Sequence, residues 1–110
     1  MRESIMSTYG RTYYCGDVNE QLTDKSVVIC GWVHRRRDLG GLVFLTVRDR
    51  AGLVQVVFQP QDAVCFEQAL TVRPEYVVRI EGVVRLRPEE MINPQMLTGR
   101  IEIAGTQKNF

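Results

Sequence analysis

The sequence predicts a small all-β domain in which one short helix separates the third and fourth of five strands. Three observations support this prediction. Two glycine-containing turns divide residues 26–59 into three strand-like segments, a single helix-compatible segment follows, and two further strand-like segments complete the chain. With 110 residues, 45% of them hydrophobic, the chain is long enough for one modest core and too short for two ordinary domains.

The N-terminal part has weaker signals than the rest of the chain. Residues 1–14 lack a clear period and are expected to form a loose, tyrosine-rich arm. Asp17 is expected to cap a short helical turn that runs to Leu22. The first strand is predicted from Ser26 to Arg37, because its first residues are apolar on both faces. Within this strand, Gly31 indicates a bulge or a sharp coil.

A three-stranded meander is predicted from the turn residues that follow. The Leu39-Gly40-Gly41 turn leads into a second strand, Leu42 to Asp49. The Arg50-Ala51-Gly52 turn leads into a third strand, Leu53 to Gln59. Pro60 ends this strand because its ring cannot donate a hydrogen bond to a sheet.

The remaining elements complete the order of three strands, one helix and two strands. A helix is predicted from Asp62 to Leu70, a fourth strand from Tyr76 to Arg87, and a fifth from Arg100 to Ala104, before a short polar tail at 106–110. This order, with a long coiled first strand, is typical of a five-stranded Greek-key barrel of the OB type. A five-stranded open sheet and an SH3-like barrel remain as alternatives.

The alternation of residues along each strand separates a core face from an outer face. It places Phe44 on the outer face of the second strand and Gln55 on that of the third. The fourth and fifth strands are expected to present Arg79, Glu81, Arg85, Arg87, Arg100 and Glu102. The residues assigned to the core are Val43, Leu45, Val47, Val54, Val56, Phe58, Tyr76, Val78, Ile80, Val84, Leu86, Ile101 and Ile103.

The segment from Gly31 to Phe58 concentrates positive charge. It holds five arginines and two aspartates, a balance of 5 − 2 = +3, whereas the whole chain is only +1. An outer face with a ring, guanidiniums, an amide and a carboxylate suits single-stranded nucleic acid: the ring stacks a base, arginines neutralise phosphates, and Gln or Glu contacts a base edge. The structural alternatives are that Phe44 covers a neighbouring hydrophobic strip, that the arginine run at 35–37 is a solvated strand edge that deters aggregation, and that Gln55 and Glu102 simply face solvent.

Several other kinds of site find no support in the sequence. Cys15, Cys30 and Cys65 are too widely spaced for a zinc site or a disulfide framework, and we expect three reduced thiols. His34 has no second histidine with which to bind a metal. Asp38 and Asp49 lie beside arginines at strand ends, where an ion pair or a turn cap is expected. No phosphate-binding loop or catalytic motif is present.

The sequence contains no signal for a membrane or for export. The longest apolar runs are far below the roughly 18 residues that a membrane span needs, and the N-terminus has no apolar segment of signal-peptide length. We therefore expect a soluble, cytoplasmic protein with no membrane partner.

The residues also carry a family resemblance. GWVHRRRDLGGLVFLTVRDRAGLVQVVF at 31–58, VRLRP at 84–88 and NPQMLTGRIEI at 93–103 closely resemble the N-terminal anticodon-binding domain of bacterial aspartyl-tRNA synthetases. The similarity covers roughly residues 13–105 and implies an OB fold at 15–105. Its implied partner is the anticodon stem-loop of tRNA-Asp.

The resemblance implies a role for particular residues. Phe44 would stack on the central anticodon base, and Gln55 would hydrogen-bond that same uracil. Arg37 and Glu102 would lie beside the anticodon. The supporting basic positions would be Arg35, Arg73, Arg85 and Arg87.

Members of the family continue into a class II catalytic domain that attaches aspartate to tRNA with ATP, whereas this sequence stops at Phe110. We therefore expect no cofactor within these residues, with ATP and Mg confined to the catalytic domain. The full-length parent is expected to be a homodimer and this chain a monomer. The alternative is a free-standing OB module that binds single-stranded nucleic acid or protein, which the polar tail favours.

Overall fold

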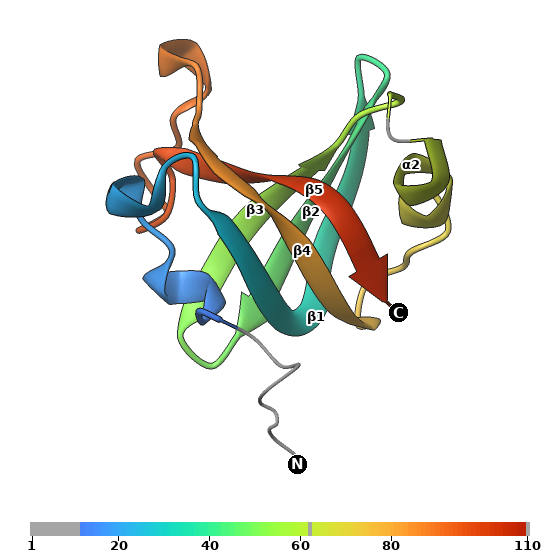
Figure 1. The fold of residues 1–110 in the computed structure, drawn as a ribbon, viewed down its shortest axis with the longest axis horizontal. Coiled ribbons are helices and arrows are strands. Elements are labelled where there is room, and N and C mark those ends of the chain that lie inside the picture. Colours follow the sequence, from blue (N-terminus) through green and yellow to red (C-terminus); the bar gives the residue numbers. More distant parts are fainter. Residues whose placement is uncertain (1–11, 62, 110) are drawn as a thin grey trace.

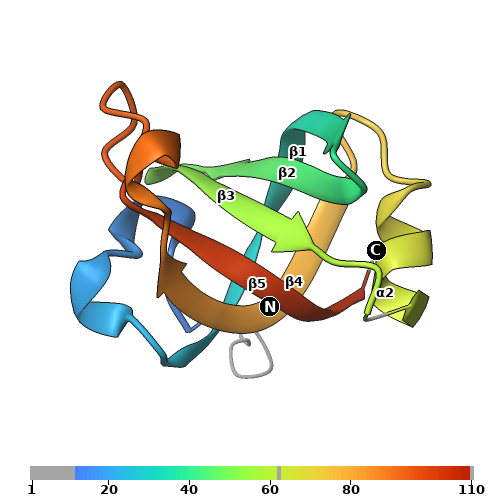
Figure 2. The same cartoon turned by 90° about the horizontal axis from the view of Figure 1, so that it is seen from above.

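In a computed structural model that describes residues 12–61 and 63–109, five strands form one closed barrel (Figure 1). The strands are β1 (Ser26–Leu39), β2 (Leu42–Asp49), β3 (Gly52–Phe58), β4 (Val77–Leu86) and β5 (Ile101–Asn109). Their order around the barrel is β1-β2-β3-β5-β4, with β3 and β5 parallel and the other neighbours antiparallel. Figure 2 shows the strands arranged around a common interior. The predicted OB-type barrel is confirmed.

The strand boundaries differ from the predicted ones mainly at the two long strands. β1 continues two residues beyond Arg37, and β5 continues to Asn109 instead of ending at Ala104. Residues 107–109 pair with β4 beyond a register shift between Glu81 and Gly82. The segment 106–109, expected as a polar tail, therefore continues the last strand of the barrel.

One α-helix and three short 3₁₀ turns connect the strands. The helix α2 (Ala63–Ala69) follows β3 and lies beside the far end of β5 in both views (Figures 1 and 2). The 3₁₀ turns are η1 (Cys15–Asp17), η2 (Glu20–Leu22) and η3 (Glu89–Met91).

The predicted cap of the N-terminal turn was wrong. Asn19 caps η2, since its side-chain oxygen accepts a hydrogen bond from the backbone N–H of Gln21 at 2.8 Å. Asp17 instead ends η1, because the chain between the two turns is extended where Val18 packs into the core. Residues 1–11 of the predicted arm lie outside the described residues, whereas Thr12 bonds to Val28 of β1.

Alternation predicted the barrel interior well except at the ends of β4. The side chains of the other eleven residues assigned to the core are at most 2% exposed. Tyr76 and Leu86, also assigned to the core, are 45% and 54% exposed. Tyr76 precedes β4 and Leu86 is its last residue. Both have the position in the alternation that points a side chain inward, but they lie beyond the packed interior.

The bulge in β1 lies after Gly31 rather than at it. The pairing of β1 with β2 shifts between Val33 and Arg35. Gly31 has another function, because a Cβ at this position would lie 2.3 Å from the carbonyl oxygen of Arg48 on β2. The absent side chain thus permits a close approach of the two backbones.

Candidate nucleic-acid interface

Four neighbouring strands bring predicted site residues together on one outer face of the barrel. Phe44 lies on β2, Gln55 on β3, Glu102 on β5 and Arg85 on β4, and we call these four residues the barrel face. Arg85 lies directly opposite Glu102 in the β4–β5 pair. Because β3 and β5 are adjacent and parallel, Gln55 and Glu102 meet although they are 47 positions apart in the sequence.

The barrel face is organised by the carboxylate of Glu102. Its Oε1 accepts a hydrogen bond from Nε2 of Gln55 at 3.1 Å, and its Oε2 accepts from Nε of Arg85 at 2.7 Å. An ionised carboxylate only accepts hydrogen bonds, so Gln55 must turn its NH₂ group toward Glu102. Its Oε1 and second N–H have no partner among the described residues, and they are therefore available to a ligand with a fixed orientation.

The barrel face is less exposed than alternation predicted. Phe44, Gln55 and Glu102 are only 7%, 7% and 6% exposed. The guanidinium of Arg37, which is paired with Phe44 across β1 and β2, lies 5.8 Å from the centre of its ring. Alternation gives the side of the sheet on which a residue lies, but not whether a long side chain from a neighbouring strand covers that residue. The Arg37 side chain must therefore move before a base can stack on this ring face.

Arg87 does not present its guanidinium to solvent as predicted. Its side chain is buried and holds the chain around η3 and the start of β5: Nε donates to Ile101 O at 2.9 Å, Nη1 to Met91 O at 3.3 Å, and Nη2 contacts Met96 Sδ at 3.8 Å. Burial lowers the pKa of the Arg87 guanidinium, an effect that nearby Glu102 opposes and that the charge of Arg37 increases. Arg87 thus holds the chain that leads into β5 and does not offer a free guanidinium to a ligand.

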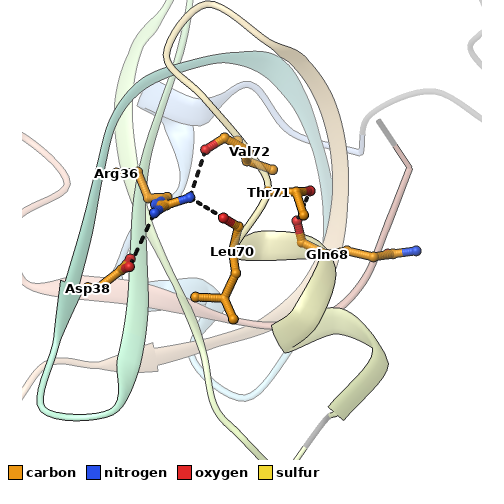
Figure 3. Close-up of polar contacts among 6 residues, drawn as sticks. All are labelled: Arg36, Asp38, Gln68, Leu70, Thr71 and Val72. Atoms are coloured by element: carbon orange, nitrogen blue, oxygen red, sulfur yellow. Dashed lines mark hydrogen bonds and ion pairs between the residues drawn. The ribbon is translucent and has the colours of Figure 1, made fainter.

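Arg36, the middle residue of the arginine run, points away from the barrel face. Figure 3 shows its Nη1 donating to the carbonyl oxygens of Leu70 and Val72, the latter at 3.1 Å, while Nη2 pairs with Asp38 at 3.2 Å. In the same picture, Thr71 Oγ1 donates to Gln68 O at 2.7 Å. Arg36 therefore joins β1 to the loop after α2, and the ion pair expected of Asp38 is confirmed.

Arg73 lies on this side of the molecule. It lines a hollow with Arg36, Leu70 and Pro74, and among the described residues no contact joins it to the barrel face.

Replacing Arg36 by Gln is expected to lower the free energy of unfolding by about 2–3 kcal/mol, because two backbone carbonyls lose a charged donor. The matched control is Arg35→Gln, since Arg35 is exposed on the same strand and should change stability by less than about 0.5 kcal/mol. Urea unfolding followed by circular dichroism measures both. Equal midpoints for the two variants would contradict the structural assignment of Arg36.

Several arginines have no carboxylate partner within the described parts of the chain. Ion pairs there include those of Arg36 with Asp38, Arg85 with Glu102 and Arg100 with Glu20. The exposed arginines outside such pairs are Arg35, Arg37, Arg48, Arg50 and Arg73. Asp49, which precedes one of them, is a turn cap, because it accepts hydrogen bonds from the N–H groups of Cys15 and Ala51. The unneutralised guanidiniums are available to phosphates.

Alternation did not identify one part of this surface. Trp32 is 37% exposed, and the guanidinium of Arg48 lies 6.0 Å from its ring centre. The bulge after Val33 places Trp32 on the same outer face as Arg35 and Arg37, and simple two-residue periodicity cannot show this.

The structure also bears on thiol, metal and membrane sites. Cys15 is buried and Cys30 half-buried, whereas the side chain of Cys65 is outside those described. In residues 12–61 and 63–109, no group of three or more His, Cys, Asp or Glu is placed to hold a metal ion. Within the same residues, no helix has the length and apolar character that a membrane span requires.

Comparison with known proteins identifies the family. The model of the tRNA anti-codon family, described as an OB-fold nucleic acid binding domain, matches residues 27–104. Aspartate–tRNA(Asp/Asn) ligases from the Corby and Philadelphia 1 strains of Legionella pneumophila are each 56% identical over 97 residues. These residues are 88% of this chain and 16% of each ligase, so the chain spans a small part of these relatives.

Two solved structures are also similar to this chain. Asparaginyl-tRNA synthetase from Pyrococcus horikoshii is 28% identical with a TM-score of 0.74, over 88% of this chain and 21% of that one. Aspartyl tRNA synthetase from Entamoeba histolytica, 18% identical, shares the fold with a TM-score of 0.79 over 96% of this chain and 22% of its own. The predicted resemblance is confirmed, and the chain belongs to the tRNA anti-codon family of OB-fold nucleic-acid-binding domains.

Proposed function

We propose that the chain is the anticodon-binding part of an aspartate–tRNA ligase and that its barrel face binds the central anticodon base of tRNA-Asp. The observation that carries this proposal is the fixed amide of Gln55, held by Glu102 on the face that also carries Phe44 of the neighbouring strand. ATP-dependent attachment of aspartate would belong to the other parts of such a ligase.

The fixed amide suits uracil better than cytosine. Uracil offers an N3–H donor next to carbonyl acceptors, which complements the Oε1 acceptor and the second N–H donor of Gln55. Cytosine has an acceptor at N3 and a donor at N4, so the same amide orientation would face like groups. A well-placed bidentate contact of this kind gives roughly 1–3 kcal/mol of discrimination.

Stacking on Phe44 requires Arg37 to leave the ring. The cation–π contact that is lost contributes about 0.5–1 kcal/mol at an exposed site. A stacked base contributes about 1–3 kcal/mol, so the exchange favours the base. The displaced guanidinium then has no carboxylate partner among the described residues and can bind a phosphate of the same strand.

Replacing Arg37 by Gln is therefore expected to weaken binding of the stem-loop about 5- to 10-fold at moderate salt. Because one phosphate contact is lost, the slope of log K against log salt should fall by about one. Fluorescence anisotropy with a labelled stem-loop, repeated at several salt concentrations, measures both quantities. An unchanged salt slope would show that Arg37 remains on the ring in the complex.

The function itself is tested by comparing a tRNA-Asp anticodon stem-loop with oligo-dT and with an RNA duplex in the same assay. Binding of the stem-loop at least 10-fold more tightly than either competitor is expected. Equal binding of oligo-dT would support a general single-strand binder, and binding of none would support a protein-interaction module. The polar tail no longer favours that free-standing alternative, because its described residues 106–109 belong to β5.

A further inference from the structure

Two further aromatic rings, each contacted by an arginine, lie near the barrel face. Trp32 and Arg48 are direct partners across β1 and β2, with the guanidinium 6.0 Å from the ring centre. The guanidinium of Arg50 lies 4.8 Å from the ring centre of Tyr14. A hollow with a volume of about 370 Å³, which is within the range of pockets for small molecules, is lined by both rings, Arg50 and the 73% exposed Val77. Asp49 also lines it, but this carboxylate is only 8% exposed and accepts hydrogen bonds from the N–H groups of Cys15 and Ala51.

This surface continues the barrel face along β2. Phe44, Thr46 and Arg48 alternate along one face of that strand, and Thr46 is the partner of Gln55 on β3. Arg48 is four positions after Phe44 on β2, which corresponds to a rise of about 13 Å along the strand. A nucleic-acid strand on the barrel face therefore passes close to Trp32 if it runs along β2.

The charge of the surface suits such a strand. Arg48 and Arg50 have no carboxylate partner within residues 12–61 and 63–109, so neither is neutralised there. Unpaired RNA bases stack on aromatic rings and on arginine planes, and both occur here in pairs. OB folds bind about 4–16 nucleotides, which is more than a three-base anticodon.

We propose that Tyr14, Trp32, Arg48, Arg50 and Val77 form a second base-binding surface, the Trp32 surface, for an unpaired loop nucleotide adjacent to the anticodon triplet. Its base stacks in the hollow beside Trp32 and Tyr14, and Arg48 and Arg50 bind its phosphates. This inference rests on the proposed binding of an anticodon loop, but it adds a contact that does not depend on the anticodon sequence.

Trp32 is the only tryptophan of the chain, so its fluorescence reports this contact directly. Titration of the 110-residue chain with the tRNA-Asp stem-loop should quench the emission at saturation. A stem-loop with an abasic nucleotide on each side of the triplet should bind less tightly and leave the emission largely unchanged. Binding of the intact stem-loop without any change in tryptophan emission would overturn the proposal.

Two substitutions separate stacking from charge. Arg48→Gln should weaken binding about 10-fold, whereas Arg48→Lys should recover the salt dependence but only part of the affinity, because Lys lacks the planar guanidinium. Lys25→Gln, at an exposed position before β1, controls for the loss of one positive charge. Wild-type affinity of Arg48→Gln would overturn the proposal.

The outcomes for the two surfaces are distinguishable. If the wild-type chain does not bind the stem-loop, the proposed function fails. If it binds and prefers a central uracil while Trp32 emission and Arg48→Gln are unaffected, only the Trp32 surface fails.

Discussion

Replacing Glu102 by Gln is expected to abolish the preference for uracil over cytosine at the central anticodon position. In the wild-type chain, the carboxylate accepts from Gln55 Nε2 and fixes the amide orientation. A glutamine at position 102 presents either an oxygen or an NH₂ group, so the amide of Gln55 can rotate and match either base. The loss should correspond to about 1–3 kcal/mol of discrimination.

The measurement for this variant is the ratio of dissociation constants for two stem-loops that differ only in the central base. The ratio should fall from at least 10 to about 1. The affinity for the uracil stem-loop itself should fall by a smaller factor than the ratio does. Glu89→Gln, at an exposed position in η3, is the control for loss of one carboxylate and should keep the wild-type ratio. A variant at position 102 that discriminates as well as the wild type would show that Gln55 is oriented by something else.

Replacing Gly31 by Ala is expected to lower the free energy of unfolding by about 3 kcal/mol, at the upper end of the usual cost of overpacking. The new Cβ would lie 2.3 Å from the Arg48 carbonyl oxygen, and this atom belongs to the backbone of a paired strand rather than to a flexible side chain. Relief therefore requires β1 and β2 to separate at the point where Trp32 pairs with Arg48.

A second glycine provides the control. At Gly40 a Cβ would meet nothing within 4 Å, but φ is +61°, so alanine there costs only the strain of the left-handed conformation, about 1–2 kcal/mol. Urea unfolding should therefore give the order wild type, Gly40→Ala, Gly31→Ala from most to least stable. The reverse order for the two variants would contradict the role of Gly31 in the close approach.

Much of the fold was accessible from the sequence because its signals are local. The turns around Gly40 and Gly52, the helix before Arg73 and the alternation in β2 and β3 depend on near neighbours along the chain. The bulge between Val33 and Arg35 and the extension of β5 to Asn109 depend on pairing with distant strands. Neither has a local signal.

The candidate site likewise has features that the sequence predicts and features that it does not. Alternation placed Phe44, Gln55 and Glu102 on one outer face, which the structure shows. Their burial, the contact of Arg37 with the Phe44 ring and the hydrogen bonds of Arg87 to backbone carbonyls depend on long side chains that cross between strands. These interactions decide which groups a ligand meets first, and two-residue periodicity does not describe them.

We propose that the barrel face distinguishes the middle anticodon base through an amide held in one orientation. The most direct test of this proposal is the affinity of the wild-type chain for two anticodon stem-loops that are identical except for uracil or cytosine at that position, measured at one moderate salt concentration. We expect at least 10-fold tighter binding of the uracil form. Equal affinity for the two stem-loops would contradict it.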